Sequence, residues 1–362
     1  MGKPVRILAL TKYGPQAAST RQRLLQFAPY LADHGIEIEA RPLLDDGYVR
    51  ALAKGERFSR RRVLASYARR LAILASANRY DLIWVHFEAF PYAPAFLERL
   101  LGFVGRPVVV DFDDAIFHMY DRHSSSLVRS LLGRKLQPLL RLATAVTVGN
   151  SYLESYVGKF NRDVTVIPTV VDTERYTPKR KELIGQPLVI GWIGSPSTWP
   201  YVERVLPYIL PRVNEAGAVF RAVGAGPAAM KWDLVEAREW SEEGEIDEVR
   251  QMDIGIMPLP EEDWAKGKCG YKLIQYMACG LPTIASPVGV NTKIVAHGET
   301  GFLASDAKAW CDALDRLLGD RELRAKMGAR GREVAVNRYS LQSQEPRLLD
   351  TLSRALGRGV HR

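Results

Sequence analysis

Four ionisable side chains stand close together in the octet DFDDAIFH: Asp111, Asp113, Asp114 and His118. Three carboxylates within four residues are costly to hold together unless they are solvated, paired with cations or titrating. A positioned carboxylate or histidine can move a proton, so the octet predicts acid–base chemistry on a hydroxyl group. Two other interpretations stay open: Asp111 as a helix cap, and chelation of a divalent cation by the aspartates.

A second candidate site is a glycine loop, residues 267–270, which opens an apolar helix expected over residues 271–279. Gly280 stands where a helix C-terminus prefers glycine, and Pro282 prevents continuation. A short buried strand is expected over residues 283–286. Asn291 is then expected to cap a second helix that ends at Gly298.

The start of the helix expected over residues 271–279 is suited to a phosphate, because its unpaired N–H groups point one way beside the positive end of the helix dipole. Two lysines add mobile positive charge, and a glutamine one turn into the helix carries an amide able to bond a diol. The candidate binding residues are Lys268, Cys269, Gly270, Tyr271, Lys272 and Gln275.

The elements before these residues must bring them to one place. The strand expected over residues 81–86 ends at His86, Phe87 and Glu88, and the strand over residues 107–110 leads into the aspartates. Ligands of open parallel sheets bind beyond the carboxyl ends of the strands. We therefore expect both polar clusters to face one crevice, with Glu88 among the binding residues.

The N-terminus predicts another part of that crevice. A buried strand over residues 5–10 is followed by a small-residue loop, 13–19, and then by a helix. Ser19 and Arg21 are candidates to meet a phosphate at this helix start. An arginine in a first helical turn is, however, more often simply a surface residue.

The chain is too long for one ordinary core and suggests two domains of α/β class. We expect a first Rossmann-like domain over residues 1–170, a polar, proline-containing linker over 171–187 and a second such domain over 188–340. The second domain restarts with a strand followed by Gly194, Ser195 and Thr198, a turn that could receive a phosphate. Residues 341–362, striped by leucines, predict a final helix.

The bulk properties are those of a soluble globular protein, with 47% hydrophobic and 25% charged residues. No apolar run approaches the ~20 residues that span a bilayer, and the N-terminus predicts a strand rather than a signal peptide. Three cysteines without metal-ligand spacing fit a reducing cytoplasm, and no metal site is expected.

The net charge of +9 calls for a polyanionic neighbour, either anionic lipid or nucleic acid. Much of the excess lies in residues 57–79, where apolar residues recur at helical spacing beside a basic stripe. Such a helix can lie on an anionic membrane, although an ordinary solvated helix is an equal alternative. The arginines are Arg57, Arg60, Arg61, Arg62, Arg69, Arg70 and Arg79.

The run KLIQYMACGLPTIASPVGVNTKIVAHGETGFL resembles the nucleotide-sugar-binding segment of the family-four retaining glycosyltransferases, which have the GT-B fold. The family pattern is Glu, seven residues, Glu, then Ala-Met-Ala-x-Gly-x-Pro-Val-Ile-Ala-Ser and later His-Gly-x-x-Gly-Phe-Leu. Gln275 falls on the second glutamate, the ribose contact, and Gly267 on the first, which usually faces the donor sugar.

The resemblance implies two Rossmann-like domains facing each other across a cleft, with the C-terminal helix crossing back to the first domain. It implies transfer of a sugar from a nucleotide diphosphate to a hydroxyl, with retained anomeric configuration, and without metal or cofactor. The family's strand-end His-Asp pair corresponds here to Asp113, expected to orient or deprotonate the acceptor. His118 is expected to hydrogen-bond the donor sugar.

This chain departs from the family pattern at the residues that contact the diphosphate. The family carries an Arg and a Lys where this chain has Ser195 and Tyr201, and Lys268 with Lys272 is expected to supply the missing charge from the other wall. Trp240, near Glu243 and Ile246, falls in the region that holds the base.

A glycan or a lipid-linked sugar of a bacterial surface polysaccharide is the expected acceptor, with the enzyme in the cytoplasm and peripheral on the inner face of the membrane. Two alternatives remain. One is a nucleotide-sugar epimerase or hydrolase of the same fold. The other is a nucleic-acid-binding protein, which is disfavoured because the arginine-rich segment has little aromatic interleaving.

Overall fold

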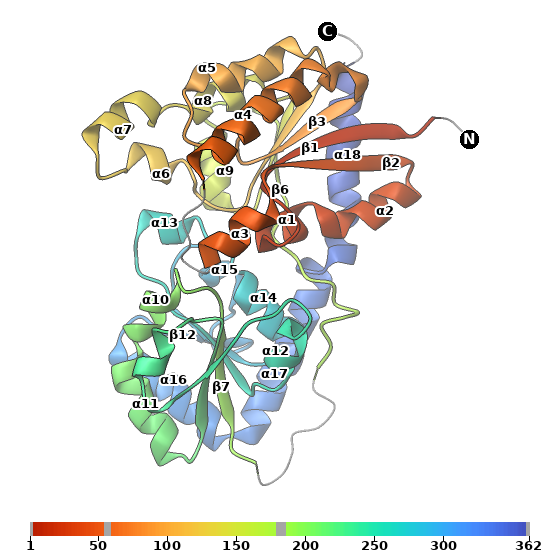
Figure 1. The fold of residues 1–362 in the computed structure, drawn as a ribbon. Coiled ribbons are helices and arrows are strands. Elements are labelled where there is room, and N and C mark those ends of the chain that lie inside the picture. Colours follow the sequence, from red (N-terminus) through yellow and green to blue (C-terminus); the bar gives the residue numbers. More distant parts are fainter. Residues whose placement is uncertain (1–2, 54–58, 179–185, 360–362) are drawn as a thin grey trace. The chain divides into compact units, whose positions relative to one another are not determined.

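The computed structural model describes residues 3–53, 59–178 and 186–359, and these form two compact units (Figure 1). The first unit holds the chain up to Thr169, the tripeptide Gly267–Cys269 and the chain from Gln344 onward. The second holds Val170–Lys266 and Gly270–Ser343. Each unit is built on a six-stranded parallel sheet, which confirms the two Rossmann-like domains predicted from the sequence.

The sheet of the first unit has the strand order β2-β1-β3-β4-β5-β6. Every side chain of its strands β3, β4 and β5 is buried, and all are apolar except His86, Asp111 and Thr147, as expected for a parallel sheet covered on both faces. The strands are β1 (Val5–Tyr13), β2 (Ile36–Leu44), β3 (Leu82–His86), β4 (Val108–Phe112), β5 (Ala145–Val148) and β6 (Val164–Val166).

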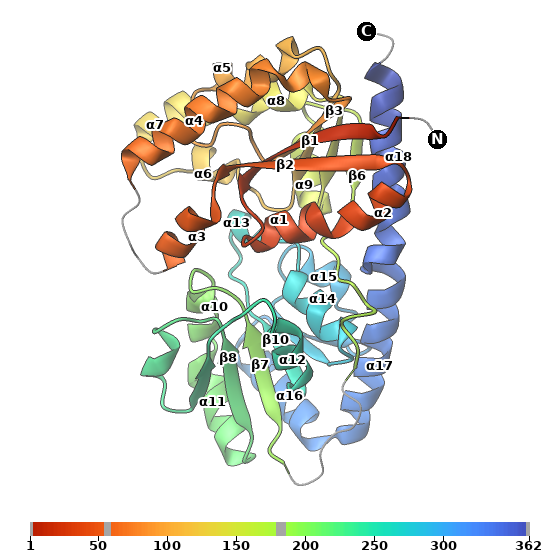
Figure 2. The same cartoon turned by 45° about the vertical axis from the view of Figure 1, so that its right-hand side comes forward.

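Helices cover both faces of this sheet (Figure 2), with α1 (Ala18–Arg23) and α2 (Ala28–Asp33) on one face and α4 (Arg60–Ala75), α5 (Ala95–Glu98) and α8 (Leu136–Leu142) on the other. The 3-10 helix η3 (Arg99–Phe103) continues from α5. The remaining helices are α3 (Asp46–Ala53), α6 (His118–Asp121), α7 (Ser126–Leu132) and α9 (Ser151–Val157).

The second unit has the strand order β12-β11-β10-β7-β8-β9. Its first strand begins at Val189, one residue after the predicted restart, and the short predicted strand at 283–286 is present as β11. The strands are β7 (Val189–Ile193), β8 (Val219–Val223), β9 (Val235–Arg238), β10 (Ile254–Met257), β11 (Thr283–Ala285) and β12 (Gly301–Leu303).

Two apolar cores lie on opposite faces of the second sheet. One packs α10 (Trp199–Glu203), α11 (Leu206–Glu215) and α16 (Ala307–Gly319) against the strands. The other packs α12 (Glu245–Arg250), α14 (Tyr271–Ala278) and part of α17 (Arg321–Arg338). The helix α14 is therefore buried along most of its length, which fixes the direction of its half-buried first two residues.

The last helix, α18 (Leu341–Gly359), joins the first unit from Gln344 onward, as the resemblance implied. Leu348 and Leu352 of its predicted leucine stripe are buried there. Residues 171–178 of the predicted linker lie in the second unit, where Val171 and Tyr176 are buried, and so does Val170, the predicted last residue of the first domain. The rest of that linker up to residue 185 lies outside the described residues.

One predicted cap is wrong. Asn291 is the first residue of α15 (Asn291–Ile294) and does not cap it. Its buried amide donates instead to the carbonyl of Ser286, 3.0 Å away, because the chain turns back sharply after β11. The helix also ends at Ile294, before Gly298, and Gly298 adopts the left-handed conformation in a later turn.

The faces that the arginine-rich helix α4 buries and exposes differ from those predicted. Arg70, assigned to the basic face, is buried, and its guanidinium donates to the carbonyls of Thr11 and Arg41 at 2.7 and 3.0 Å. Burial lowers the pKa of Arg70 to about 10. Leu64 and Leu71, assigned to the apolar stripe, are instead 70% and 41% exposed. Arg57 lies outside the described residues.

Within the described part of the chain, no helix is long and apolar enough to cross a bilayer.

Candidate functional site

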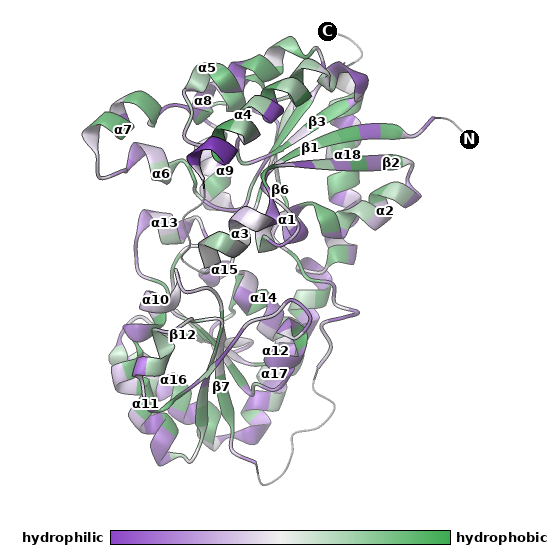
Figure 3. Cartoon of the chain, viewed as in Figure 1, coloured by the Kyte–Doolittle hydropathy of each residue, from purple (hydrophilic) through white to green (hydrophobic). Residues whose placement is uncertain are grey.

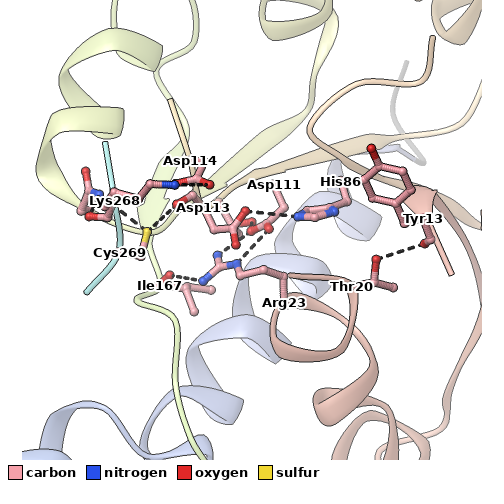
Figure 4. Close-up of polar contacts among 12 residues, drawn as sticks. Tyr13, Thr20, Arg23, His86, Asp111, Asp113, Asp114, Ile167, Lys268 and Cys269 are labelled. Atoms are coloured by element: carbon pink, nitrogen blue, oxygen red, sulfur yellow. Dashed lines mark hydrogen bonds and ion pairs between the residues drawn. The ribbon is translucent and has the colours of Figure 1, made fainter. Parts of the chain in front are cut away.

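The three aspartates at the end of β4 face three different basic side chains (Figure 4). Asp111, the fourth residue of β4, is buried and accepts hydrogen bonds from Arg23 Nε and Nη2 at 2.9 and 2.6 Å and from Thr147 Oγ1 at 2.5 Å. Burial opposes the charge of Arg23, but the attraction of Asp111 leaves the pKa of Arg23 raised. Asp111 is thus a strand residue that docks α1 on the sheet, and the helix-cap interpretation is wrong.

Asp113 forms a pair with His86. The Nε2 atom of His86 lies 3.3 Å from Oδ1 of Asp113, and the ring of His86 is buried at the end of β3. Burial opposes ionisation of Asp113, but the hydrogen bond and charge of His86, with the charges of Arg23 and Lys268, outweigh it and lower the pKa of Asp113. Asp113 is therefore a carboxylate held as an anion beside an imidazole, suited to receive a hydroxyl proton or hydrogen bond.

The sequence placed His86 at a strand end without giving it a role of its own. The signal was present in the strand register, because His86 of β3 pairs with Asp111 of β4, two residues before Asp113. Phe87, the next residue, has a positive φ of 67°. A non-glycine residue in this conformation is strained, and such strain often accompanies functional loops.

Asp114 pairs with Lys268, whose Nζ lies 3.1 Å from both carboxylate oxygens. Next to it, the thiol of Cys269 donates to the carbonyl of Asp113 at 2.8 Å. Burial raises the pKa of Cys269, so the thiol stays neutral. Residues 267–269 are thus packed on the strand ends of the first unit. The side chain of Cys269, predicted as a donor contact, takes part in this packing, so the geometry favours a structural role for its thiol.

Close packing also explains why residue 267 is a glycine. A Cβ atom at this position would lie 2.4 Å from the Cβ of Ala115, so no side chain fits. Asn150, the N-cap of α9, donates to the carbonyls of Gly267 and Lys268 at 3.0 and 3.1 Å and holds the tripeptide in place. Close packing therefore accounts for the glycine at the place of the family's first glutamate.

His118 is not brought to Asp113. Its Nδ1 lies 2.8 Å from Asp121 Oδ1 and its Nε2 lies 2.8 Å from Tyr152 Oη, so both ring nitrogens have structural partners. The side chain lies at the start of α6, where it joins this helix to α9. The geometry favours a structural role for His118.

Glu88, predicted to lie in the binding crevice, is turned into the protein, and the geometry favours a structural role for it. Its carboxylate accepts from Lys135 Nζ at 2.6 Å and from Tyr120 Oη at 2.7 Å, and all three side chains are buried. A buried carboxylate needs such partners because an unpaired charge is expensive in the interior. The network holds the loop that follows His86.

Ser19 and Arg21 lie on α1, which begins at Ala18, inside the predicted loop 13–19, and has no side-chain cap. Ser19 is half-buried, and Arg21 Nη1 donates to the carbonyl of Pro15 at 2.8 Å. The neighbouring Thr20 donates to the carbonyl of Tyr13 (Figure 4). Arg23, which the sequence did not single out, is the residue of α1 that reaches the aspartates.

In the second unit, the predicted phosphate site begins at Gly270, whose φ of 69° requires glycine. Tyr271 and Lys272, both half-buried, follow in the first turn of α14. The ammonium group of Lys272 lies 5.5 Å from the centre of the Trp192 ring. A Cβ at Gly194 would lie 2.7 Å from Cε of Lys272, so the turn after β7 reaches the start of α14.

The turn after β7 is held by its own polar groups. Thr198 Oγ1 donates to the carbonyl of Ser195 at 3.1 Å, and the hydroxyls of Ser195 and Ser197 lie 2.9 Å apart. Ser195 is exposed and Thr198 is half-buried. The structure therefore gathers Gly194, Lys272 and the turn beside them within one unit.

Gln275 is buried one turn into α14 and its amide is already engaged. Its Nε2 donates to Tyr176 Oη at 3.0 Å and to Glu245 Oε1 at 2.9 Å. Tyr176 also donates to Oε1 of Glu245, and burial raises the pKa of Tyr176. The other carboxylate oxygen accepts from Trp240 Nε1 at 2.8 Å. The sequence had selected Trp240 and Gln275 but missed Glu245, which joins them.

Comparisons with known proteins agree with this architecture. The family model described as Glycosyltransferase Family 4 matches residues 22–175, and the model described as Glycosyl transferases group 1 matches residues 187–320. The chain is similar in structure to a glycosyltransferase from Rickettsia africae ESF-5, with a TM-score of 0.70 and 14% identity over 98% of this chain and 99% of that one. It is also similar to HepE of Anabaena in complex with UDP, with a TM-score of 0.68 and 15% identity over 96% and 100%.

Two curated relatives match parts of the chain. D-inositol 3-phosphate glycosyltransferase of Arthrobacter sp. (strain FB24) is 25% identical over 295 residues, 69% of this chain and 65% of that protein. N-acetyl-alpha-D-glucosaminyl L-malate synthase of Bacillus anthracis is 37% identical over 76 residues, 20% of each chain. The chain therefore spans less than two thirds of the length of these relatives.

Proposed function

Because the chain belongs to the family-four (group 1) glycosyltransferases and has their GT-B fold, we propose that it moves a sugar from a nucleotide diphosphate to a hydroxyl with retention of configuration. The second unit binds the donor and the first unit binds the acceptor. The observation that carries the proposal is the first turn of α14, where Gly270 and Lys272 stand at a helix N-terminus beside Gly194.

The donor's diphosphate is the leaving group, and its developing negative charge must be neutralised. The N–H groups of the first turn of α14 and the ammonium group of Lys272 supply positive potential there. Ser195 and Thr198 add neutral donors from the turn after β7. Lys268 pairs with Asp114 in the first unit. We assign it two roles: it holds this aspartate, and it contributes to binding the phosphate.

On the acceptor side, Asp113 orients the attacking hydroxyl and His86 orients Asp113. The hydroxyl attacks the face of the anomeric carbon that the diphosphate leaves, which gives retention without a protein nucleophile. The departing phosphate oxygen helps to take the proton. Ser19 and Arg21, on the loop and helix after β1, are assigned to the acceptor.

A test of the donor assignment compares Lys272→Ala with Lys293→Ala, an exposed lysine on α15. Loss of one charge-assisted phosphate contact is expected to weaken nucleoside diphosphate affinity at least about tenfold. Titration calorimetry measures this, and the Lys293 variant should bind like the wild type. Equal affinities for all three proteins would remove Lys272 from the site. Product analysis with a nucleotide sugar separates transfer from epimerisation or hydrolysis.

The acceptor is proposed to be a glycan or lipid-linked sugar of a bacterial surface polysaccharide, reached from the inner face of the membrane. The surface of α4 and η3 supports this. Leu64 and Leu71, one heptad apart on α4, are exposed with Phe103 of η3, which is 85% exposed. Leu71 and Phe103 line a groove of about 350 Å³. Exposed apolar groups of this size commonly mark an interaction surface.

The charges around this groove favour an anionic membrane. In Figure 3 the first turn of α4 is strongly hydrophilic, whereas α5 and α7 are largely hydrophobic. Between residues 59 and 106 the acidic side chains are Asp81, which is half-buried, and the buried Glu88 and Glu98. The exposed cations there are Arg60, Arg61, Arg62, Arg69, Arg79, Arg99 and Arg106.

Vesicle flotation tests this surface. The wild type should float with vesicles containing phosphatidylglycerol, bind phosphatidylcholine vesicles weakly, and lose binding at about 1 M salt. The double variant Leu64→Ser/Leu71→Ser should lose flotation. A control, Met230→Ser/Leu234→Ser, changes two exposed residues of the second unit and should retain it. Undiminished flotation of the α4 variant, or stronger binding to an oligonucleotide than to vesicles, would contradict the assignment.

A further inference from the structure

The half-buried start of α12 and the middle of α14 share one carboxylate. Glu245, the first residue of α12, places Oε1 against the amide of Gln275 and the hydroxyl of Tyr176, and Oε2 against the indole N–H of Trp240. Three donors on one side chain hold the carboxylate in a fixed position. A carboxylate that accepts hydrogen bonds at both of its oxygens presents them in a defined direction.

The neighbours of Glu245 form one continuous surface of the second unit. A Cβ at Gly224 would lie 2.3 Å from the carbonyl of Gly194 and 3.0 Å from Cβ of Trp240. Gly194 in turn approaches Lys272, three residues before Gln275 and hence on the same side of α14. The turn after β7, which contains Gly194, and the Glu245 carboxylate thus lie along the same face of the second unit. Trp240, 37% exposed, flanks the carboxylate.

The chemistry that fits this order of groups is a nucleoside diphosphate. The phosphates lie at the start of α14, a ribose follows, and a base can stack on an indole. A carboxylate beside the carboxyl ends of parallel strands is a well-suited partner for a ribose hydroxyl, since it accepts from both hydroxyls of a diol. Oε2 of Glu245 accepts from Trp240 Nε1, and a carboxylate oxygen can accept more than one hydrogen bond.

We propose that Glu245 is the ribose-binding carboxylate of this protein. Gln275, at the position where a glutamate would stand by resemblance, donates to Glu245 and fixes its orientation instead of binding the ribose as an anion. One negative charge is kept, but it is carried by α12 rather than α14. The inference rests on the proposed function, because it assumes a nucleoside diphosphate at α14.

A charge swap tests the proposal. Affinities for ribonucleoside diphosphates and for their 2′-deoxy and 3′-deoxy analogues are measured by calorimetry on the full chain. The wild type should prefer the ribonucleotide over at least one deoxy analogue by about 10- to 100-fold, as expected for a hydrogen bond to a charged group. Glu245→Gln should reduce this preference to about threefold or less. Glu215→Gln, an exposed glutamate at the end of α11 in the same unit, should leave it unchanged.

The double variant Glu245→Gln/Gln275→Glu moves the carboxylate back to α14 and should restore the preference to within about threefold of the wild type, which a purely structural role of Glu245 would not do. A Glu245→Gln variant that is folded and keeps the full preference overturns the inference while leaving the proposed function intact. A double variant without restored preference also overturns it. A wild type that binds no nucleoside diphosphate overturns both.

Discussion

Asp113 shows how single residues acquire a chemical role from their neighbours. Its carboxylate is buried, and on burial alone its pKa would rise. The hydrogen bond of His86 and the charges of Arg23 and Lys268 reverse that effect and lower the pKa. The anion is therefore present across the physiological range. The octet that contains Asp113 was recognisable in the sequence, but its partners were not.

Asp113→Asn is expected to lower kcat at least about tenfold while the fold persists, because the amide cannot act as an anion toward the acceptor hydroxyl. Since the folded-state pKa of Asp113 is lowered, its stabilising contribution is present above the unfolded value of 3.8 and is lost only as the pH falls through the folded value. Steady-state rates between pH 5 and 8 should therefore show no acid limb from this carboxylate.

His118→Ala provides the comparison. Its ring joins Asp121 to Tyr152, so the variant is expected to lose thermal stability and to keep kcat within about threefold. A tenfold loss of kcat in this variant at unchanged melting temperature would restore the role that the sequence predicted. A normal rate in Asp113→Asn would assign the aspartate to structure.

At the scale of elements, close backbone packing positions α14. Gly328 of α17 lies against the turn after α14, and a Cβ there would be 1.9 Å from the carbonyl of Gly280. Gly280 itself has a positive φ of 73°, as predicted for the residue after a helix C-terminus. The end of α14 is therefore fixed by contact with α17, and its first turn is directed by the same packing.

Gly328→Ala is expected to destabilise the second unit by about 1–3 kcal/mol, because overpacking against a backbone carbonyl exceeds the helix propensity gained. Urea unfolding followed by circular dichroism measures the change. Gly319→Ala, at the end of α16, meets no atom within 4 Å and should be neutral or stabilising by up to about 1 kcal/mol. A Gly328 variant as stable as the Gly319 variant would show that α17 can move away.

At the scale of the whole molecule, the two units divide the chemistry. The Asp113 and His86 pair belongs to the first, and the surface that contains Lys272 and Glu245 belongs to the second. A nucleoside diphosphate at about 100 times its Kd should stabilise the folded chain by about 2.7 kcal/mol and raise Tm by several degrees. Hydrogen exchange should slow in α14 and residues 239–246 more than in β1 or β3.

An equal concentration of inorganic phosphate is the control for that measurement, since it matches the ionic strength without offering a ribose or base. Protection confined to β1 and β3 would move the nucleotide to the first unit and contradict the division of roles.

The sequence by itself determined the fold class and the position of α14 in the chain. Apolar runs of strand length, the glycines at 270 and 280 and the long run to Leu303 are local signals, because backbone conformation and strand burial depend on neighbouring residue types. The same signals located Asp113, Lys272 and Gln275.

Only the tertiary structure decided which polar groups meet. Arg23 reaches Asp111 across 88 residues, and Gln275 reaches Glu245 across 30. Such pairs depend on which strand ends and helix faces lie together, and no local pattern encodes that. The same reason explains Arg70, whose charge suggested a surface position but whose helix face is covered by β2. The partners of an ionisable group, more than its type, thus determine what it does here.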